Sequence, residues 1–222
     1  MEVFGVILGA MALVVAIGIE WAKRPRLTIE AASFASSGPT AWTFAPVWVR
    51  NKPMTPLLRW FLSREPAQGC RATLDFYTWG TDARAIPSVP GRWSGNPEPL
   101  RRVRIEPSNK TVTASTGGGS HTVMQYLAEY DPTIDSREFD VRASEAGEQV
   151  AVAVLRADGS GDAYAWGTES YAYPLWEKPE WRLVHGTYRV VVTIEANSMR
   201  KQREFKLEFL DNDFAKFRLT EA

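Results

Sequence analysis

The chain has 222 residues, of which 26 are basic and 26 acidic, so its formal net charge is zero. This neutrality argues against broad electrostatic capture of nucleic acid, and we expect no nucleic-acid partner. The single cysteine, Cys70, excludes an internal disulfide and any multi-cysteine metal site. Nine tryptophans and ten phenylalanines are ample for a hydrophobic core, which argues against a disordered chain.

The first predicted element is an uncharged apolar run over residues 3–19, which ends at Glu20. At about 1.5 Å per residue, this run and its ends just span a hydrocarbon core of roughly 30 Å. A buried core helix would carry a polar stripe, and a signal peptide would carry basic residues before the run and small residues at a cleavage point. We therefore predict that residues 1–24 form a transmembrane helix with a basic flank, and that membrane lipid is its partner.

Three basic residues, Lys23, Arg24 and Arg26, follow the apolar run, and none precedes it. Because basic residues collect on the cytoplasmic side of a membrane, this asymmetry favours a single-pass protein with a cytoplasmic globular domain. The asymmetry rests on few charges, so the opposite orientation stays open.

Small residues recur along one side of the predicted helix, at Gly5, Gly9, Ala12 and Ala16. Such a stripe lets two helix backbones approach closely, and Gly5 and Gly9 form a G-x-x-x-G pair. The stripe therefore predicts self-association into a homo-oligomer, although glycine and alanine are common in membrane helices in any case.

After residue 26 the hydrophobic period changes to two, which is typical of antiparallel strands that cover a core on one face. We predict an all-β, antiparallel, Ig-like β-sandwich of roughly eight to ten strands that occupies residues 25–222. The glycine-rich stretch Thr113–Ser120 is either a long crossover within this one domain or a boundary between two smaller ones. The inward-facing rows are Leu27 and Ile29; Ala45, Val47 and Val49; Ala72, Leu74 and Phe76; Val150, Val152 and Val154; Tyr188, Val190, Val192 and Ile194; Phe205, Leu207 and Phe209; and Phe217 and Leu219.

Several stretches of the sequence carry a resemblance: residues 183–192 (LVHGTYRVVV), 69–76 (GCRATLDF), 91–94 (GRWS) and 97–99 (PEP). The first looks like the penultimate strand of Ig-like domains, in which the Tyr188 hydroxyl would close a tyrosine corner. Together they resemble uncharacterised prokaryotic single-pass membrane proteins that pair one helix with an Ig-like sandwich. The resemblance implies an architecture and no activity. The paired cysteines of antibody-type domains are missing.

Motifs for catalysis are absent from the sequence. His121 and His185 have no nucleophile or metal partner nearby in sequence, and no nucleophile elbow, zinc-protease helix or phosphate-binding glycine loop occurs. We expect no enzyme activity, no cofactor and no metal site.

One stretch nevertheless has the spacing of a calcium loop, because oxygen-bearing side chains follow one another at Asp158, Ser160, Asp162 and Glu169. Ala163 stands where such a loop needs glycine, so a hairpin turn between two strands is the simpler interpretation.

An unusually apolar segment, Pro53–Leu62, lies between two predicted strands. It is either a short helix that plugs one end of the sandwich or an exposed patch that contacts lipid or a partner. In the second case the contact residues are Leu57, Leu58, Arg59, Trp60 and Phe61, with Arg59 extending its charge towards water.

The sequence favours a membrane-anchored, non-enzymatic β-sandwich that acts as a binding or scaffolding module for an unknown protein partner. The alternative is an extracytoplasmic module that binds carbohydrate or another cell-envelope ligand. In that case Trp79, Trp93, Trp166 and Trp176 would offer stacking surfaces unless they belong to the core.

Overall fold

The computed structural model describes the chain except for residues 1, 34, 37–41, 114–119, 135–136, 145, 157–161, 174–175, 198 and 211–216. The α-helices are α1 (Glu2–Lys23) and α2 (Pro56–Arg59), and the 3-10 helices are η1 (Pro132–Ile134), η2 (Thr168–Ala172) and η4 (Pro179–Trp181). The strands are β1 (Leu27–Ala31), β2 (Ala35–Ser36), β3 (Trp42–Asn51), β4 (Ala67–Thr78), β5 (Val89–Trp93), β6 (Leu100–Thr113), β7 (Ser120–Tyr130), β8 (Glu138–Val141), β9 (Glu148–Arg156), β10 (Ala163–Ala165), β11 (Arg182–Leu183), β12 (Gly186–Ala196), β13 (Met199–Phe209) and β14 (Phe217–Glu221).

The prediction of an antiparallel β domain is confirmed, but its arrangement as a sandwich is not. The main strands form one connected sheet in the order β1-β3-β9-β5-β4-β12-β13-β14. β5 makes the connection, because its first residues pair with β4 while Arg92 and Trp93 pair with β9. At the change of partner stands Gly91, where an added Cβ would lie 2.9 Å from the Ala72 Cβ.

The two ends of this sheet approach each other, which makes the sheet barrel-like and nearly closed. β1, at one end, contacts β13 and β14 at the other. A side chain bridges the remaining gap, because Arg203 Nη1 donates a hydrogen bond of 2.9 Å to the Ile29 carbonyl oxygen. We refer to this sheet and its enclosed core as the sheet body.

Most of the predicted inward rows line the core of the sheet body. Leu74, Phe76, Val190 and Val192 are fully buried, and the predicted rows on β1, β3, β13 and β14 are buried with them. The Tyr188 hydroxyl donates a 2.5 Å hydrogen bond to the Val184 carbonyl oxygen, so the predicted tyrosine corner is present. On the second face of β12, Val191 and Thr193 are buried as well.

The predicted row on β9 is wrong at one residue. Val150 and Val152 join the main core, but Val154 joins a separate aromatic cluster with Tyr164, Trp166 and other residues. The cause is an irregularity in the β3–β9 ladder, where Ala45 pairs with Ala153 and the next residue, Pro46, pairs with Ala151. This extra residue shifts the alternation, as a β-bulge does, so that Ala153 and Leu155 face the main core instead.

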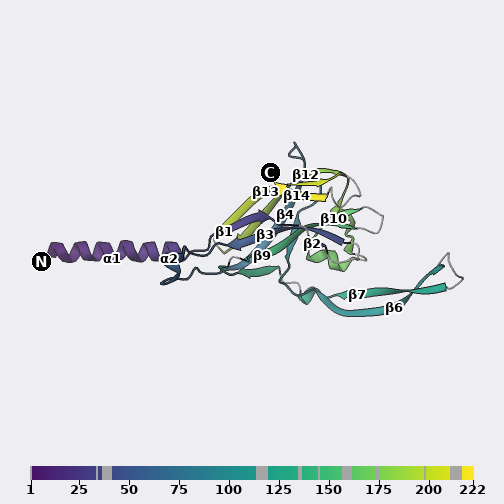
Figure 1. Ribbon diagram of the computed structural model, residues 1–222, viewed down its shortest axis with the longest axis horizontal. Coiled ribbons are helices and arrows are strands. Elements are labelled where there is room, and N and C mark those ends of the chain that lie inside the picture. Colours follow the sequence, from purple (N-terminus) through teal and green to yellow (C-terminus); the bar gives the residue numbers. More distant parts are fainter. Residues whose placement is uncertain are drawn as a thin grey trace.

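β6 and β7 form a two-stranded arm that extends from the sheet body, on the side away from α1 (Figure 1). Among the described strands they pair only with each other. The predicted crossover or boundary at Thr113–Ser120 therefore joins two partner strands, and its residues 114–119 lie outside the described chain.

α1 leaves the sheet body at the opposite end (Figure 1). The large apolar side chains that α1 presents to solvent, from Ile7 to Trp21, are 52–69% exposed. Within the part of the chain that the structure describes, no helix has the length and apolar character needed to cross a membrane, and the predicted transmembrane span is not confirmed.

Candidate functional site

The most unusual surface lies where α1 joins the sheet body, and we call residues 20–26 and 51–66 the helix junction. At its centre is Asn51, which is fully buried. The Asn51 side chain accepts a 2.9 Å hydrogen bond from the Arg26 backbone amide and donates to the carbonyl oxygens of Glu65 (2.8 Å) and Val141 (3.3 Å). One polar side chain therefore ties together the chain entering β1, the chain entering β4 and the end of β8.

Two more hydrogen bonds hold the end of α1 against the second half of the junction. The Glu65 amide donates to the Lys23 carbonyl oxygen at 2.9 Å, and Arg64 Nη1 donates to the Arg24 carbonyl oxygen at 2.8 Å. Carbonyl groups at the C-terminal end of a helix lack partners within the helix. The two donors therefore give hydrogen bonds to carbonyl oxygens that α1 itself cannot satisfy. The direction in which α1 leaves the sheet body is therefore set by hydrogen bonds.

The predicted contact segment is exposed beside this helix end. Leu57, Trp60 and Phe61 are 84%, 87% and 84% exposed, and Leu58 and Arg59 are exposed as well. Pro56 begins the single turn of α2, which contains no buried residue. The alternative in which this segment plugs one end of the β domain is therefore wrong.

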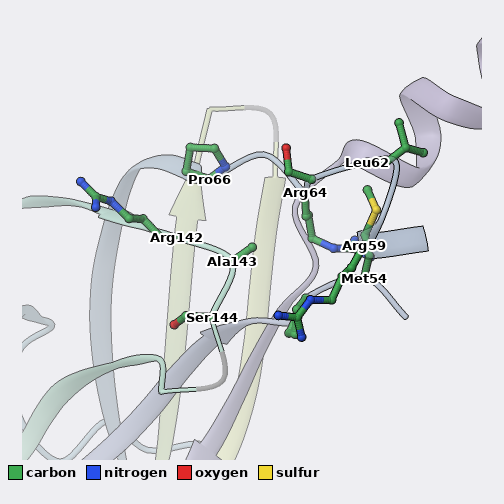
Figure 2. A pocket seen from close by; sticks show the side chains of 10 residues that line it. Met54, Arg59, Leu62, Arg64, Pro66, Arg142, Ala143 and Ser144 are labelled. Atoms are coloured by element: carbon green, nitrogen blue, oxygen red, sulfur yellow. The ribbon is translucent and has the colours of Figure 1, made fainter. Parts of the chain in front are cut away.

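A groove of about 710 Å³ opens at the helix junction, next to this segment (Figure 2). One wall comes from the junction, with Met54, Arg59 and Arg64, and the other comes from Ala143 and Ser144 after β8. Figure 2 shows the Arg59 side chain reaching towards the Ala143–Ser144 wall, whereas the Arg142 side chain extends away. Met54 is buried, so the groove combines apolar lining with guanidinium groups.

The groove region is strongly basic in a chain that is neutral overall. Residues 20–26, 52–66 and 142–144 contain seven basic residues and two acidic ones. Glu20, one of the two, lies 3.4 Å from the Lys23 ammonium group. Burial lowers the pKa of Arg64, and the nearby positive charge of Arg26 lowers that pKa further. The local charge therefore suits an anion.

The tryptophans proposed as stacking surfaces are mostly not available for that role. Trp93 is fully buried and stacks on Phe139, and Trp166 is buried in the aromatic cluster. Trp176 is half-buried in the same cluster, 5.3 Å from the Trp42 ring, while Trp79 is exposed with the Lys206 ammonium 5.4 Å from its ring. Trp166 and Trp176 contact each other, with ring centroids 5.6 Å apart, but Trp79 and Trp93 lie elsewhere, so the four residues form no common platform.

Two of the four residues with calcium-loop spacing, Asp158 and Ser160, lie in residues 157–161, outside the described chain. Asp162 and Glu169 are described, and both contact cations: Arg182 lies 2.7 Å from Asp162, and Lys178 lies 2.5 Å from Glu169. β9 and β10, on either side of the stretch, pair with each other as the hairpin interpretation predicts. Among the described residues, no group of three or more His, Cys, Asp or Glu residues could hold a metal ion.

Of the other described residues with reactive side chains, Cys70 is buried and His185 is exposed. Burial raises the pKa of the Cys70 thiol to about 11, so the thiolate is scarce at neutral pH. The His185 ring packs edge-on against Phe209 at 4.6 Å, and the side chain of His121 lies outside the description. In the predicted stripe of small residues on α1, Gly9, Ala12 and Ala16 are exposed; the exposure of Gly5 lies outside the described part of the structure.

Comparison with protein-family models, curated proteins and solved structures finds no match to this chain. The resemblance to prokaryotic single-pass proteins with an Ig-like sandwich therefore stays a prediction.

The sequence led to Leu57–Phe61 and missed the polar residues that organise the helix junction. No sequence pattern marks Asn51 for this role, although a buried asparagine can replace several backbone partners at once. Arg64 stood two residues beyond the apolar segment. Its proximity to Arg26 depends on a long-range fold that no local pattern reports.

Proposed function

We propose that this protein is held at a membrane by α1 and by the segment Leu57–Phe61, and that its β domain serves as a non-enzymatic binding or scaffolding module. One observation carries the proposal: large apolar side chains are exposed along α1, which ends at the helix junction, and in the segment Leu57–Phe61 of the same junction. Soluble proteins rarely expose large apolar surfaces without a partner that covers them.

The composition of the helix junction suits the boundary between lipid and water. Tryptophan is enriched at that boundary because its ring is apolar and its N–H group is polar. Trp21 and Trp60 are both exposed here, and the Arg26 guanidinium lies 4.6 Å from the Trp21 ring. Basic side chains beside such aromatics would reach the phosphate level of the bilayer.

The same charges favour one side of the membrane for the β domain. Because Lys23, Arg24 and Arg26 follow α1, we propose a cytoplasmic β domain. Protease added to intact cells should leave a C-terminal tag on the full chain uncut until the cells are lysed. Loss of the tag from intact cells would place the β domain outside and favour the alternative of a cell-envelope ligand.

The β6–β7 arm is the surface that we propose for the unknown protein partner. It extends away from α1, so it would point away from the membrane (Figure 1). Its two strands pair only with each other among the described strands, which leaves backbone groups along both edges for an added strand.

Flotation of the full chain with phosphatidylcholine vesicles tests the membrane proposal. The variant Val14→Arg/Ile17→Arg places two charges on exposed α1 positions and should abolish flotation, because charge in the apolar layer is costly. The matched control Val184→Arg/Leu210→Arg changes two equally apolar, exposed residues of the β domain and should float like the wild type.

The contact segment is tested by Trp60→Asp/Phe61→Asp, which should weaken flotation by about tenfold while the thermal unfolding midpoint stays unchanged. Wild-type protein that does not float, or that hides α1 in a stable oligomer without lipid, would contradict the proposed function.

A further inference from the structure

One face of the β6–β7 arm joins the core of the molecule at the root of the arm. Leu100 and Tyr130, the first pair of the β6–β7 ladder, are half-buried. Both pack against the aromatic cluster around Trp166. The face of the arm that contains Tyr130 is therefore the face that is turned towards the sheet body at the root.

The same face is made of apolar residues beyond the root. Alternate residues of a strand lie on one face, and residues opposite each other on a ladder share it. Counted along β7 from Tyr130, this face takes three further ladder pairs, which we call the arm face: Val103 with Ala128, Ile105 with Tyr126, and Pro107 with Met124. The positions between them on β6 are Arg102, Arg104 and Glu106, so the charges of this stretch belong to the opposite face.

The described part of one chain provides no second layer for the arm. Neither β6 nor β7 pairs with another described strand, and Figure 1 shows the arm extending beyond the sheet body. A two-stranded ribbon is marginally stable in water unless further strands or a packed layer support it. The composition of the arm face therefore predicts a layer that covers it.

We propose that the arm face packs against the arm face of a second copy of this chain in the same membrane. Copies anchored by α1 have the same orientation to the bilayer, so a two-fold axis that relates them runs along the membrane normal. The arm extends on the side away from α1, so the two arms would leave the membrane side by side (Figure 1). In a face-to-face contact about this axis, β6 of one copy lies over β7 of the other.

The size and the charge of the arm face suit copies that share a membrane. A stable interface between free proteins takes roughly 20–30 residues from each partner. The arm face has six positions, which is few for a dimer in solution. Anchoring both copies in one bilayer raises their effective concentration, so a small apolar contact is enough. Because Arg102 and Arg104 belong to the opposite face, like charges do not meet in this contact.

This inference rests on the proposed membrane anchoring and adds a second copy of the chain as a partner. The unknown protein partner of the proposed function would use the edges of the arm. The second copy uses its face, so the two contacts do not compete.

Thiol cross-linking of the full chain on phosphatidylcholine vesicles tests the arrangement. Val103→Cys and Ile105→Cys place a thiol on the arm face, whereas Arg102→Cys and Arg104→Cys place it on the opposite face. A cross-linker that spans about 10 Å, the spacing of stacked sheets, should give on the order of tenfold more dimer with the first two variants. The wild type is the background control, because Cys70 is buried.

Two double variants on β7 test the apolar contact in the Val103→Cys background. Met124→Lys/Tyr126→Lys puts two charges on the arm face and should abolish the cross-link, because buried charge without a partner is costly. Gln125→Lys/Leu127→Lys puts the same charges on the opposite face of the same strand and should keep the cross-link. Equal losses in the two variants would overturn the proposal.

The pattern of cross-links separates the sources of failure. Equal cross-linking from all four β6 positions would indicate pairing through strand edges or random collision, and it contradicts the face-to-face contact. Floated protein without any cross-link would mean that something other than a second copy covers the arm face, so the proposal would be wrong. Wild-type protein that does not float contradicts the proposed function instead.

Discussion

The sheet body and the helix junction place their large apolar side chains in opposite ways. In the sheet body the apolar side chains are inside, and Trp93, Phe76 and Phe205 are fully buried. In the helix junction the large apolar side chains Leu57, Trp60 and Phe61 are outside, and a buried polar residue, Asn51, holds the segments together. The difference teaches that exposed hydrophobic residues can belong to a well-defined structure when hydrogen bonds, rather than packing, fix the backbone beneath them.

The largest expected effect separates two tryptophans. Trp93→Ala should lower the free energy of unfolding by about 3–5 kcal/mol, because it leaves a cavity in the core. It also removes the 3.1 Å hydrogen bond from Trp93 Nε1 to the Cys70 carbonyl oxygen. Trp60→Ala should change the stability by less than about 0.5 kcal/mol, because its side chain is already exposed. Chemical denaturation of both variants measures this, and equal losses would break the comparison.

Asn51→Ala tests the polar centre of the helix junction. It should cost about 3 kcal/mol, because the Arg26 amide and the carbonyl oxygens of Glu65 and Val141 would lose a buried partner. Amide hydrogen exchange should rise first at Arg26 and Glu65, whose amides lie in the junction. A loss spread evenly over the sheet body would show that the junction is not a separate unit.

Gly167→Ala tests close packing at the edge of the sheet body. An added Cβ would overlap the Pro90 carbonyl oxygen and lie 3.0 Å from the Val89 Cγ1. We expect a loss of about 2 kcal/mol, because neither the backbone nor the core can easily move away. Thermal unfolding measures it. Gly9→Ala, where nothing lies within 4 Å of the added Cβ, is the control that should have no such effect.

Among the variants expected to destabilise the protein, Tyr188→Phe should have the smallest effect, about 1 kcal/mol, since it removes one hydrogen bond and keeps the ring. The ring is buried, and only the bond to the Val184 carbonyl oxygen is lost. Urea denaturation should show a shifted midpoint with an unchanged slope. A loss as large as that of Trp93→Ala would mean that the corner organises the core as well.

The sequence predicted the strands well where one local rule applied. The alternating rows on β4, β12 and β13 were found because each strand keeps one face in the core along its length. The prediction for β9 is wrong at Val154, because the bulge that shifts the alternation depends on the partner strand β3. The sandwich arrangement is not confirmed for a similar reason, because β5 is only five residues long and its change of partner at Gly91 leaves no local pattern.

The candidate site was predictable only in its apolar half. A run such as Pro53–Leu62 stands out in any sequence, and it led to the exposed Trp60 and Phe61. The groove was not predictable, because its walls come from segments about 80 residues apart, at Arg59 and Arg142. The hydrogen bonds of Asn51 span 14 to 90 residues for the same reason, so no local pattern reveals them.

The position of Asn51 also determines how the molecule would respond to mechanical force. Leu27, the first residue of β1, pairs with Asn51, so a pull on α1 would act on the β1–β3 ladder at this first pair. Antiparallel strands that are pulled apart from one end separate one pair at a time and resist little force. Because the Asn51 side chain is also bonded to the Arg26 amide and to the carbonyl oxygens of Glu65 and Val141, the tension is shared with β4 and β8 before the first pair can open.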